Sequence, residues 1–368
     1  MTVLSTPIRF LLKKQQMAVR SALHTRFFSS NIDTATTLAF DRPLKKLQRN
    51  NVAKSYANKS GEYDYIRTEL ASRLVDRLDD IIRDEGFPLA LDIGSGPGYI
   101  YKEIVKDDGF DGSGGIGGVR KIVMIDSSEE MLHRDEGQLL SMTDEMKGRC
   151  SLYRLVADEE GPLTQFPDGT FDLVLSAGAM HSVNDLPGLW KEIRRVLKPD
   201  GCFMFAMVGG STLNELRSSM VLAELERDGG VSPHVGPFVE FSDVGALLTN
   251  AGFNLTTIDI DTIKVGYPNA FVLMEHLQRM GESNVCINRR DRMSVDTFLA
   301  SASIYDSIYP LENQDAHEND IEATVQVIYG IGWAPDSSQP KPKERGSASH
   351  KIGDIVVNET KISHETSK

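Results

Sequence analysis

A glycine-rich turn follows a short apolar stretch in LDIGSGPGYI, residues 91–100. Glycines at positions 94, 96 and 98 permit backbone torsions that other residues rarely adopt, and they let a ligand approach the main chain closely. A helix beginning after such a turn presents unpaired N–H groups and the positive end of its dipole to a ligand. Residue types and spacing therefore predict a turn that binds a small molecule.

The spacing argues against a dinucleotide. The dinucleotide pattern GxGxxG requires glycine where Tyr99 stands, whereas the third glycine comes one residue earlier, at Gly98. An acid, Asp92, also precedes the first glycine, and its carboxylate would repel a pyrophosphate. It suits a ligand with positive charge, such as the ammonium group of an amino acid.

Two more acids follow the next expected strands. Asp126 ends the apolar stretch of VMIDSS, where a carboxylate can accept hydrogen bonds from both hydroxyls of a ribose. Asp158 follows the next apolar stretch, in LVADEE, and is placed to meet an adenine amino group. A lone aspartate after a strand often caps a helix, but three such acids at successive strand ends, with the glycine turn, indicate a nucleoside site.

The elements that must position these acids alternate along the chain. Apolar strands are expected at Leu89–Ile93, Lys121–Asp126, Leu152–Ala157, Phe171–Ser176 and Cys202–Val208. Helices are expected at Tyr63–Ile82, Pro97–Val105, Ser127–Gln138 and Leu186–Leu197, with a turn at LKPDG, residues 197–201. This alternation predicts a doubly wound α/β fold, whose ligands bind beyond the carboxyl ends of the strands.

The pattern changes after Val208. Further helices are expected at Thr212–Arg227, Phe241–Ala251, Phe271–Met280 and Met293–Tyr305, with strands at Phe253–Ile260 and Ala323–Trp333 that bring a mostly parallel sheet to seven strands. We divide the chain into a presequence at 1–36, a helical lead-in at 37–85, a cofactor domain at 86–208, substrate-facing helices completing the sheet at 209–333, and a tail without regular structure at 334–368. The glycine-rich stretch 107–118 is expected to be a flexible surface insertion.

Charge is unevenly distributed. The net charge is −13, yet residues 1–31 contain five basic side chains and no acid. This beginning, with TRFFSS at 25–30, is typical of a mitochondrial import presequence; the alternative is a disordered basic tail. The acidic remainder disfavours nucleic acid as a partner. Three scattered cysteines predict neither a disulfide framework nor a zinc site, and no apolar run is long enough to span a membrane.

Five motifs in order resemble class I S-adenosyl-L-methionine-dependent methyltransferases: LDIGSGPG, VMIDSS, LVADEE, FDLVLS and LKPDGCFMF. The resemblance implies S-adenosyl-L-methionine as cofactor, with its methionine part on Asp92 and the turn, its ribose on Asp126 and its adenine on Asp158. The residues expected to bind it are Asp92, Gly94, Ser95, Gly96, Gly98, Asp126, Ser127, Asp158, Glu159 and Ser176.

Longer stretches are similar to a narrower group, the mitochondrial assembly factors of respiratory complex I described as arginine hydroxylases on a methyltransferase fold. MGESN at 280–284 and GGVSPH at 229–234 are examples. The resemblance implies hydroxylation of an arginine in a core subunit of complex I, in the mitochondrial matrix, and leaves peripheral association with the inner membrane open. The chain departs from the group at Ser182, where a tryptophan is usual.

Two histidines are candidate catalytic residues. His181 follows the fourth strand, where it either acts as a general base or is a structural imidazole. His234 either lines the substrate entrance or is an ordinary loop residue. Glu282 and Asn284 either contribute to the site or cap a helix. No local 2-His-1-carboxylate spacing is visible, so no metal is assigned.

Two other functions stay open at this point. The first is methyl transfer to a small molecule or a protein, in which the enzyme mainly aligns the reacting groups. The second is a non-catalytic assembly chaperone that uses the cofactor as a structural ligand. Motifs that bind the cofactor cannot separate these functions from hydroxylation, because all three need the same nucleoside site.

Overall fold

The computed structural model describes residues 38–106, 114–290, 292–311, 320–341 and 346–347. The chain forms two compact units, residues 1–335 and 336–368, and every helix and strand of the described residues belongs to the first. The expected presequence lies outside the described residues.

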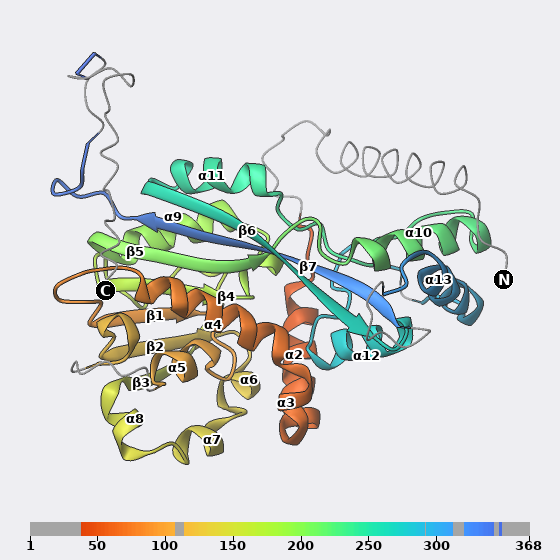
Figure 1. The fold of residues 1–368 in the computed structure, drawn as a ribbon, viewed down its shortest axis with the longest axis horizontal. Coiled ribbons are helices and arrows are strands. Elements are labelled where there is room, and N and C mark those ends of the chain that lie inside the picture. Colours follow the sequence, from red (N-terminus) through yellow and green to blue (C-terminus); the bar gives the residue numbers. More distant parts are fainter. Residues whose placement is uncertain (1–37, 107–113, 291, 312–319, 342–345, 348–368) are drawn as a thin grey trace, which may run out of the picture. The chain divides into compact units, whose positions relative to one another are not determined.

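A single seven-stranded sheet organises the first unit (Figure 1). Its strands are β1 Leu89–Ile93, β2 Lys121–Asp126, β3 Ser151–Val156, β4 Phe171–Ala177, β5 Leu197–Val208, β6 Asn254–Tyr267 and β7 Ile321–Trp333. The order is β3-β2-β1-β4-β5-β7-β6; the first five strands are parallel and β7 is antiparallel to both of its neighbours. The expected doubly wound, mostly parallel α/β sheet is confirmed.

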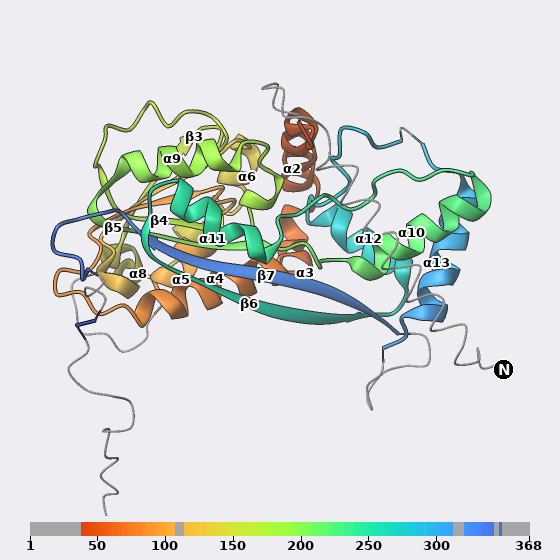
Figure 2. The same cartoon turned by 90° about the horizontal axis from the view of Figure 1, so that it is seen from above.

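Helices cover both faces of this sheet (Figure 2). One face packs against α4 Tyr65–Asp79 and α5 Tyr99–Ile104, and the other against α9 Leu186–Val196 and α11 Phe241–Asn250. Side chains of β1 alternate between the two cores, as the pleat requires: Ala90 lies in the first and Leu91 in the second. Burial on both faces explains why the central strands read as nearly continuous apolar runs.

The remaining helices connect strands, pack against the long strands β6 and β7, or precede the sheet. Three short helices join β2 to β3: α6 Glu129–His133, α7 Glu136–Leu140 and α8 Asp144–Arg149. A third core is formed by α10 Asn214–Arg227, α12 Ala270–Arg279 and α13 Val295–Ile308 with residues of β6 and β7. Before the sheet come α2 Arg42–Tyr56 and α3 Ser60–Tyr63. Helix α2 is capped by Asp41, whose carboxylate accepts the N–H of Leu44 at 3.0 Å.

Two sequence predictions about loops are corrected. The LKPDG segment is part of β5 rather than a separate turn. The pairing of β5 with β4 shifts register between Phe171 and Leu173, so the extra residues of the segment form an irregularity within the strand, where Asp200 has a φ of 58°. The end of the glycine-rich stretch is not a free surface loop. Residues 116–118 form a 3₁₀ helix, and the carbonyl of Gly117 accepts the N–H of Phe87 at 2.9 Å. Residues 107–113 lie outside the described residues.

Several bounds also differ from the sequence prediction. The expected helix 127–138 is divided into α6 and α7, and β6 continues to Tyr267 because it pairs with β7 along most of its length.

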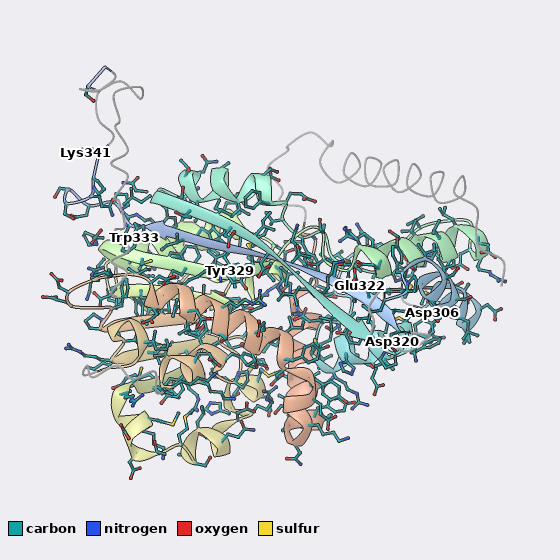
Figure 3. All side chains as sticks on the ribbon, in the orientation of Figure 1. Asp306, Asp320, Glu322, Tyr329, Trp333 and Lys341 are labelled. Atoms are coloured by element: carbon teal, nitrogen blue, oxygen red, sulfur yellow. The ribbon has the colours of Figure 1, made fainter. Side chains whose placement is uncertain are left out.

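Figure 3 shows Tyr329 and Trp333 on β7. The ring of Trp333 lies 6.3 Å from that of Phe87, and the guanidinium of Arg77 lies 3.8 Å from the ring centre of Tyr329. Aromatic residues thus join β7 to the core.

Candidate functional site

The glycine turn after β1 has the strained backbone that its sequence predicts. Gly94, Gly96 and Gly98 have φ values of 66°, 56° and 94°, a region that favours glycine. A Cβ atom on Gly94 would lie 2.2 Å from the Cβ of Ala179, which follows β4. The turn is tied to β2 by the N–H of Ser95, which donates to the carbonyl of Ile125 at 3.0 Å. Close packing thus brings the ends of three strands together.

Asp92 is the last but one residue of β1, beneath this turn, and is fully buried. Neither of its carboxylate oxygens has a hydrogen-bond partner within the described part of the chain. Burial raises the pKa of this carboxyl well above its ordinary value, and the nearby charge of Asp126 acts in the same direction. A buried carboxylate without a partner is costly. Its two oxygens are therefore positioned for a ligand that brings hydrogen-bond donors, as an ammonium group does.

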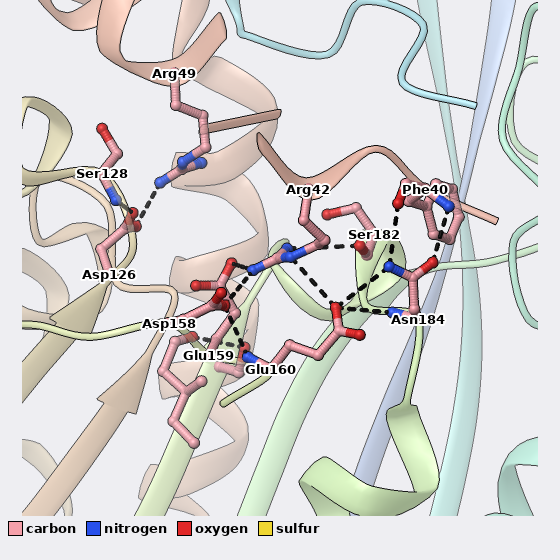
Figure 4. A network of polar contacts seen from close by, with 12 residues as sticks. Phe40, Arg42, Arg49, Asp126, Ser128, Asp158, Glu159, Glu160, Ser182 and Asn184 are labelled. Carbon is pink, nitrogen blue, oxygen red and sulfur yellow. Dashed lines mark hydrogen bonds and ion pairs between the residues drawn. The ribbon is translucent and has the colours of Figure 1, made fainter. Parts of the chain in front are cut away.

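Asp126 is bound from three directions (Figure 4). One oxygen accepts the N–H of Gly96 at 2.9 Å, and the other accepts the N–H of Ser128 at 2.8 Å. The guanidinium of Arg49, from α2, lies 2.5 Å from the first oxygen, and both side chains are buried. Asp126 is expected from the sequence to face a ribose, and the arginine on the same carboxylate is an addition that the motifs do not predict.

A second arginine of α2 binds the acids after β3 (Figure 4). The guanidinium of Arg42 lies 2.8 Å from Asp158, 2.6 Å from Glu159 and 3.3 Å from Glu160. The side chain of Asp158 is still 56% exposed, whereas that of Glu159 is buried. Two shallow cavities, of about 560 and 330 Å³, meet at Asp158 and Gly161. Asp158 therefore stays accessible to a ligand, despite its ion pair.

Besides Ser95, the two other serines expected in the site lie at the same edge. Ser127 is buried directly after Asp126. Ser176 is fully buried in β4, and its hydroxyl donates to the carbonyl of Ile93 at 2.8 Å. This bond joins β4 to the end of β1, next to the glycine turn, and gives Ser176 a structural part in shaping the site.

Glu282, itself partly exposed, is the centre of an ionic cluster whose other members are buried. The ammonium of Lys45 lies 2.5 Å from one of its oxygens, which also lies 3.2 Å from Nε2 of His181, and Arg67 pairs with the other oxygen. Burial lowers the pKa of His181 below its ordinary value, against the attraction of Glu282, so the imidazole is held neutral at neutral pH. Its Nδ1 has no partner among the described residues. From the sequence, Glu282 either contributes to the site or caps a helix; in the structure three side chains contact it.

His234 contacts a different carboxylate. Its Nε2 lies 3.0 Å from the fully buried Glu224 and 3.2 Å from the hydroxyl of Ser232. The loop that carries it does reach the first cluster, since the ring of Phe238 lies 5.6 Å from that of His181. His181 and His234 are therefore held by separate acids, and these contacts alone account for the position of His234.

Sequence reasoning missed the basic residues of α2. Arg42, Lys45 and Arg49 follow one another at intervals of three and four, which places them on one face of a helix. That spacing could have been recognised in the sequence, because a basic helix face that precedes a sheet with acids at its strand ends predicts ion pairs between the helix and those acids. Arg67, on α4, was also missed, and its surroundings there give no comparable signal.

No group of three or more His, Cys, Asp and Glu side chains in the described residues is arranged to hold a metal ion. None of their helices is both long enough and apolar enough to cross a membrane.

The parallel sheet, the glycine turn and the acids at the strand ends define a methyltransferase-type domain. The family described as "Methyltransferase domain" matches residues 91–205, which contain the glycine turn, the three acids and most of the parallel strands. S-adenosyl-L-methionine is the cofactor of such domains, and the unpaired carboxylate of Asp92 beneath the glycine turn fits its amino acid part.

Longer alignments specify the family. The chain is 43% identical over 316 residues to "Arginine-hydroxylase NDUFAF5, mitochondrial" of Danio rerio, covering 86% of this chain and 89% of that protein. It is 44% identical over 322 residues to the protein of the same name in Rattus norvegicus, covering 87% and 85%. The chain belongs to the family of mitochondrial arginine-hydroxylase NDUFAF5, which confirms the narrower resemblance of its sequence. A solved structure, the YcgJ protein of Bacillus subtilis, is 16% identical with a TM-score of 0.47, covering 72% of this chain and 98% of its own.

Proposed function

We propose that the carboxyl edge of the sheet binds S-adenosyl-L-methionine. Asp92 and the turn at 94–98 hold the methionine part, Asp126 the ribose and Asp158 the adenine. The observation that carries this assignment is the fully buried, unpaired carboxylate of Asp92 beneath backbone that only glycine adopts easily. When bound, the cofactor supplies a sulfonium group with a transferable methyl. Glu159, beside the adenine position, already pairs with Arg42 and supports the edge.

The chain, on this proposal, hydroxylates an arginine side chain of another protein. The relatives that it matches over most of its length are named arginine-hydroxylases and mitochondrial. The motif resemblance implies a core subunit of complex I as substrate. The expected presequence at 1–36 supports action in the matrix. The whole chain has a net charge of −13, and the acidic part that follows the presequence suits a basic segment of a partner protein. Peripheral contact with the inner membrane is part of the same proposal.

His181 is the residue of this site best placed to accept a proton. It is buried and held neutral, its Nε2 faces Glu282, and its Nδ1 is left without a partner by the side chains described. A carboxylate on one imidazole nitrogen fixes the ring and makes the other nitrogen more basic. His234 carries no comparable argument, because Glu224 and Ser232 occupy its ring nitrogen.

Peptide mass analysis of complex I subunits tests the proposal. Cells without the protein are complemented with the wild type, with His181→Ala, or with His133→Ala, an exposed histidine that serves as the control. The mass of one oxygen on an arginine, present with the wild type and the control but lost with His181→Ala, supports hydroxylation with His181 taking part.

The same experiment separates the alternatives. Methyl transfer is favoured by the match to a methyltransferase domain, and it requires added methyl groups that become labelled from labelled S-adenosyl-L-methionine. Complex I that assembles fully with His181→Ala, and with no modified arginine in any sample, would instead identify a chaperone.

A further inference from the structure

A second buried side chain beside the glycine turn has a hydrogen-bonding edge without a partner among the described residues. Arg67 lies on α4 and is 6% exposed. Its Nη2 donates to Glu282, whereas Nη1 has no acceptor in the described ranges. A guanidinium presents its donors in a fixed planar fork, so an unused buried edge indicates an acceptor that the chain itself does not provide.

The position of Arg67 relates it to Asp92. A Cβ atom on Gly178 would lie 3.9 Å from Cγ of Arg67, so Arg67 lies against the backbone directly after β4. The next residue, Ala179, meets Gly94 of the turn that follows Asp92. Strands β1 and β4 are neighbours in the sheet. The open edge of Arg67 and the unpaired carboxyl of Asp92 therefore lie at adjacent strand ends beside the same turn.

Glu282 holds the guanidinium in place. It binds one edge of Arg67 and is itself fixed by Lys45 and His181. The edge of the fork turned away from Glu282 remains for a second carboxylate, and arginine often binds carboxylates through two N–H groups at once. This arrangement leaves Arg67 little freedom to seek another partner.

We propose that Arg67 binds the α-carboxylate of the cofactor's methionine while Asp92 binds its α-ammonium. The inference rests on the proposed cofactor site and adds the anionic half of amino acid recognition to it. Both ends of the zwitterion then meet an opposite charge, and the carboxyl of Asp92 and the open edge of Arg67 gain hydrogen-bond partners together. Glu282 acts as a positioning residue for Arg67.

Calorimetric titration with two cofactors tests this assignment. S-adenosylmethionine and decarboxylated S-adenosylmethionine both keep the ammonium, sulfonium and adenosine, and they differ in the carboxylate alone. The wild type should bind the complete cofactor roughly 10- to 100-fold more tightly, the range for a charge-assisted hydrogen bond in a buried site. Arg67→Met should lower affinity for the complete cofactor to that for the decarboxylated one and leave the latter unchanged.

Arg73→Met is the matched control. Arg73 lies on the same helix, is about one-third exposed and pairs with Glu69 and Asp261. It should keep the wild-type preference. Arg67→Lys keeps the charge without the fork and should retain part of the preference; it also replaces Arg67→Met if that variant fails to fold.

Each result separates this inference from the cofactor site. A folded Arg67→Met protein that keeps the full preference, or that loses both ligands equally, overturns the role of Arg67. Equal loss of affinity for both ligands would be expected if Arg67 bound an anionic group of the protein substrate and only stabilised the fold of the cofactor site. A wild type that binds neither compound overturns the proposed cofactor site itself.

Discussion

Arg49 places its guanidinium 2.5 Å from Asp126, although 77 residues separate the two in the chain. The pair joins α2 to the end of β2, where the ribose of the cofactor is proposed to bind. Asp126 also accepts two backbone N–H groups, from Gly96 and Ser128. A carboxylate offers about four acceptor positions, so Arg49 occupies one that the ribose hydroxyls would otherwise use.

Arg49→Met should destabilise the free protein and enlarge the stabilisation by cofactor. Removing one partner of a buried ion pair leaves an uncompensated charge and costs roughly 3 kcal/mol. Ribose hydroxyls would return hydrogen bonds to Asp126, so saturating S-adenosylhomocysteine should raise the Tm of the variant by more than it raises that of the wild type. Thermal unfolding with and without the ligand measures both effects.

Lys54→Met is the control for this comparison. Lys54 lies on the same helix and pairs with Glu130 on the surface, where ion pairs contribute little. Equal increments in Tm for Arg49→Met and the wild type would show that Arg49 and the ligand do not share Asp126.

The sheet could be predicted from sequence because local signals and tertiary packing agree there. Bounds expected for β1 and β2 match the structure, since both strands are short apolar runs buried on both faces. The glycine turn was equally readable, because residues with positive φ demand glycine. The LKPDG segment was not, because a register shift is decided by the partner strand rather than by local turn residues.

The ion pairs across the site could not be predicted in the same way. Residues 38–60 are polar and basic, and that composition is as compatible with a solvated lead-in as with a packed helix. Lys45 and Arg67 each lie more than 200 residues before Glu282 in the chain, and only the fold brings them together. Spacing can predict one face of a helix, but it cannot identify a partner so distant.

Asp92→Asn should weaken cofactor binding without weakening the fold. The substitution removes a buried carboxylate that lacks a partner in the described chain, so the Tm of the free protein should stay the same or rise. Affinity for S-adenosylmethionine should fall roughly 10- to 100-fold, because a charge-assisted hydrogen bond to the ammonium is lost. Calorimetry and thermal unfolding measure the two quantities. The fully exposed Asp144→Asn should change neither, and a large loss of Tm with unchanged affinity for Asp92→Asn would contradict this role.

Gly96→Arg should abolish cofactor binding. Gly96 has a φ of 56°, which costs other residues about 1–2 kcal/mol, and its Cβ would lie 3.1 Å from the ring of Tyr99 and 3.6 Å from Arg49. A long side chain added there fills the space above the turn. Gly137→Arg is the control, because nothing lies within 4 Å of its Cβ position on α7. Unchanged affinity for S-adenosylhomocysteine in a folded Gly96→Arg protein would refute the location of the site.

Lys45 predicts a pH dependence of stability. Burial lowers the pKa of its ammonium to about 8, against the attraction of Glu282, while the unfolded chain has the ordinary value of 10.5. Between these values the unfolded state binds the proton and the native state has released it. The free energy of unfolding therefore rises with pH in this window through Lys45, by at most about 3 kcal/mol, and the penalty for burying the charge is fully present below pH 8.

Comparison with Lys45→Met isolates this effect from the other groups that titrate in alkali. Urea unfolding from pH 7 to 10 should show a constant difference in unfolding free energy between wild type and variant up to about pH 8. Above that pH the wild type should gain stability relative to Lys45→Met, because only the wild type loses the buried charge. The surface variant Lys54→Met should show no such change. Parallel curves for the wild type and Lys45→Met would mean that Glu282 keeps Lys45 charged throughout, with the ion pair outweighing the cost of burial.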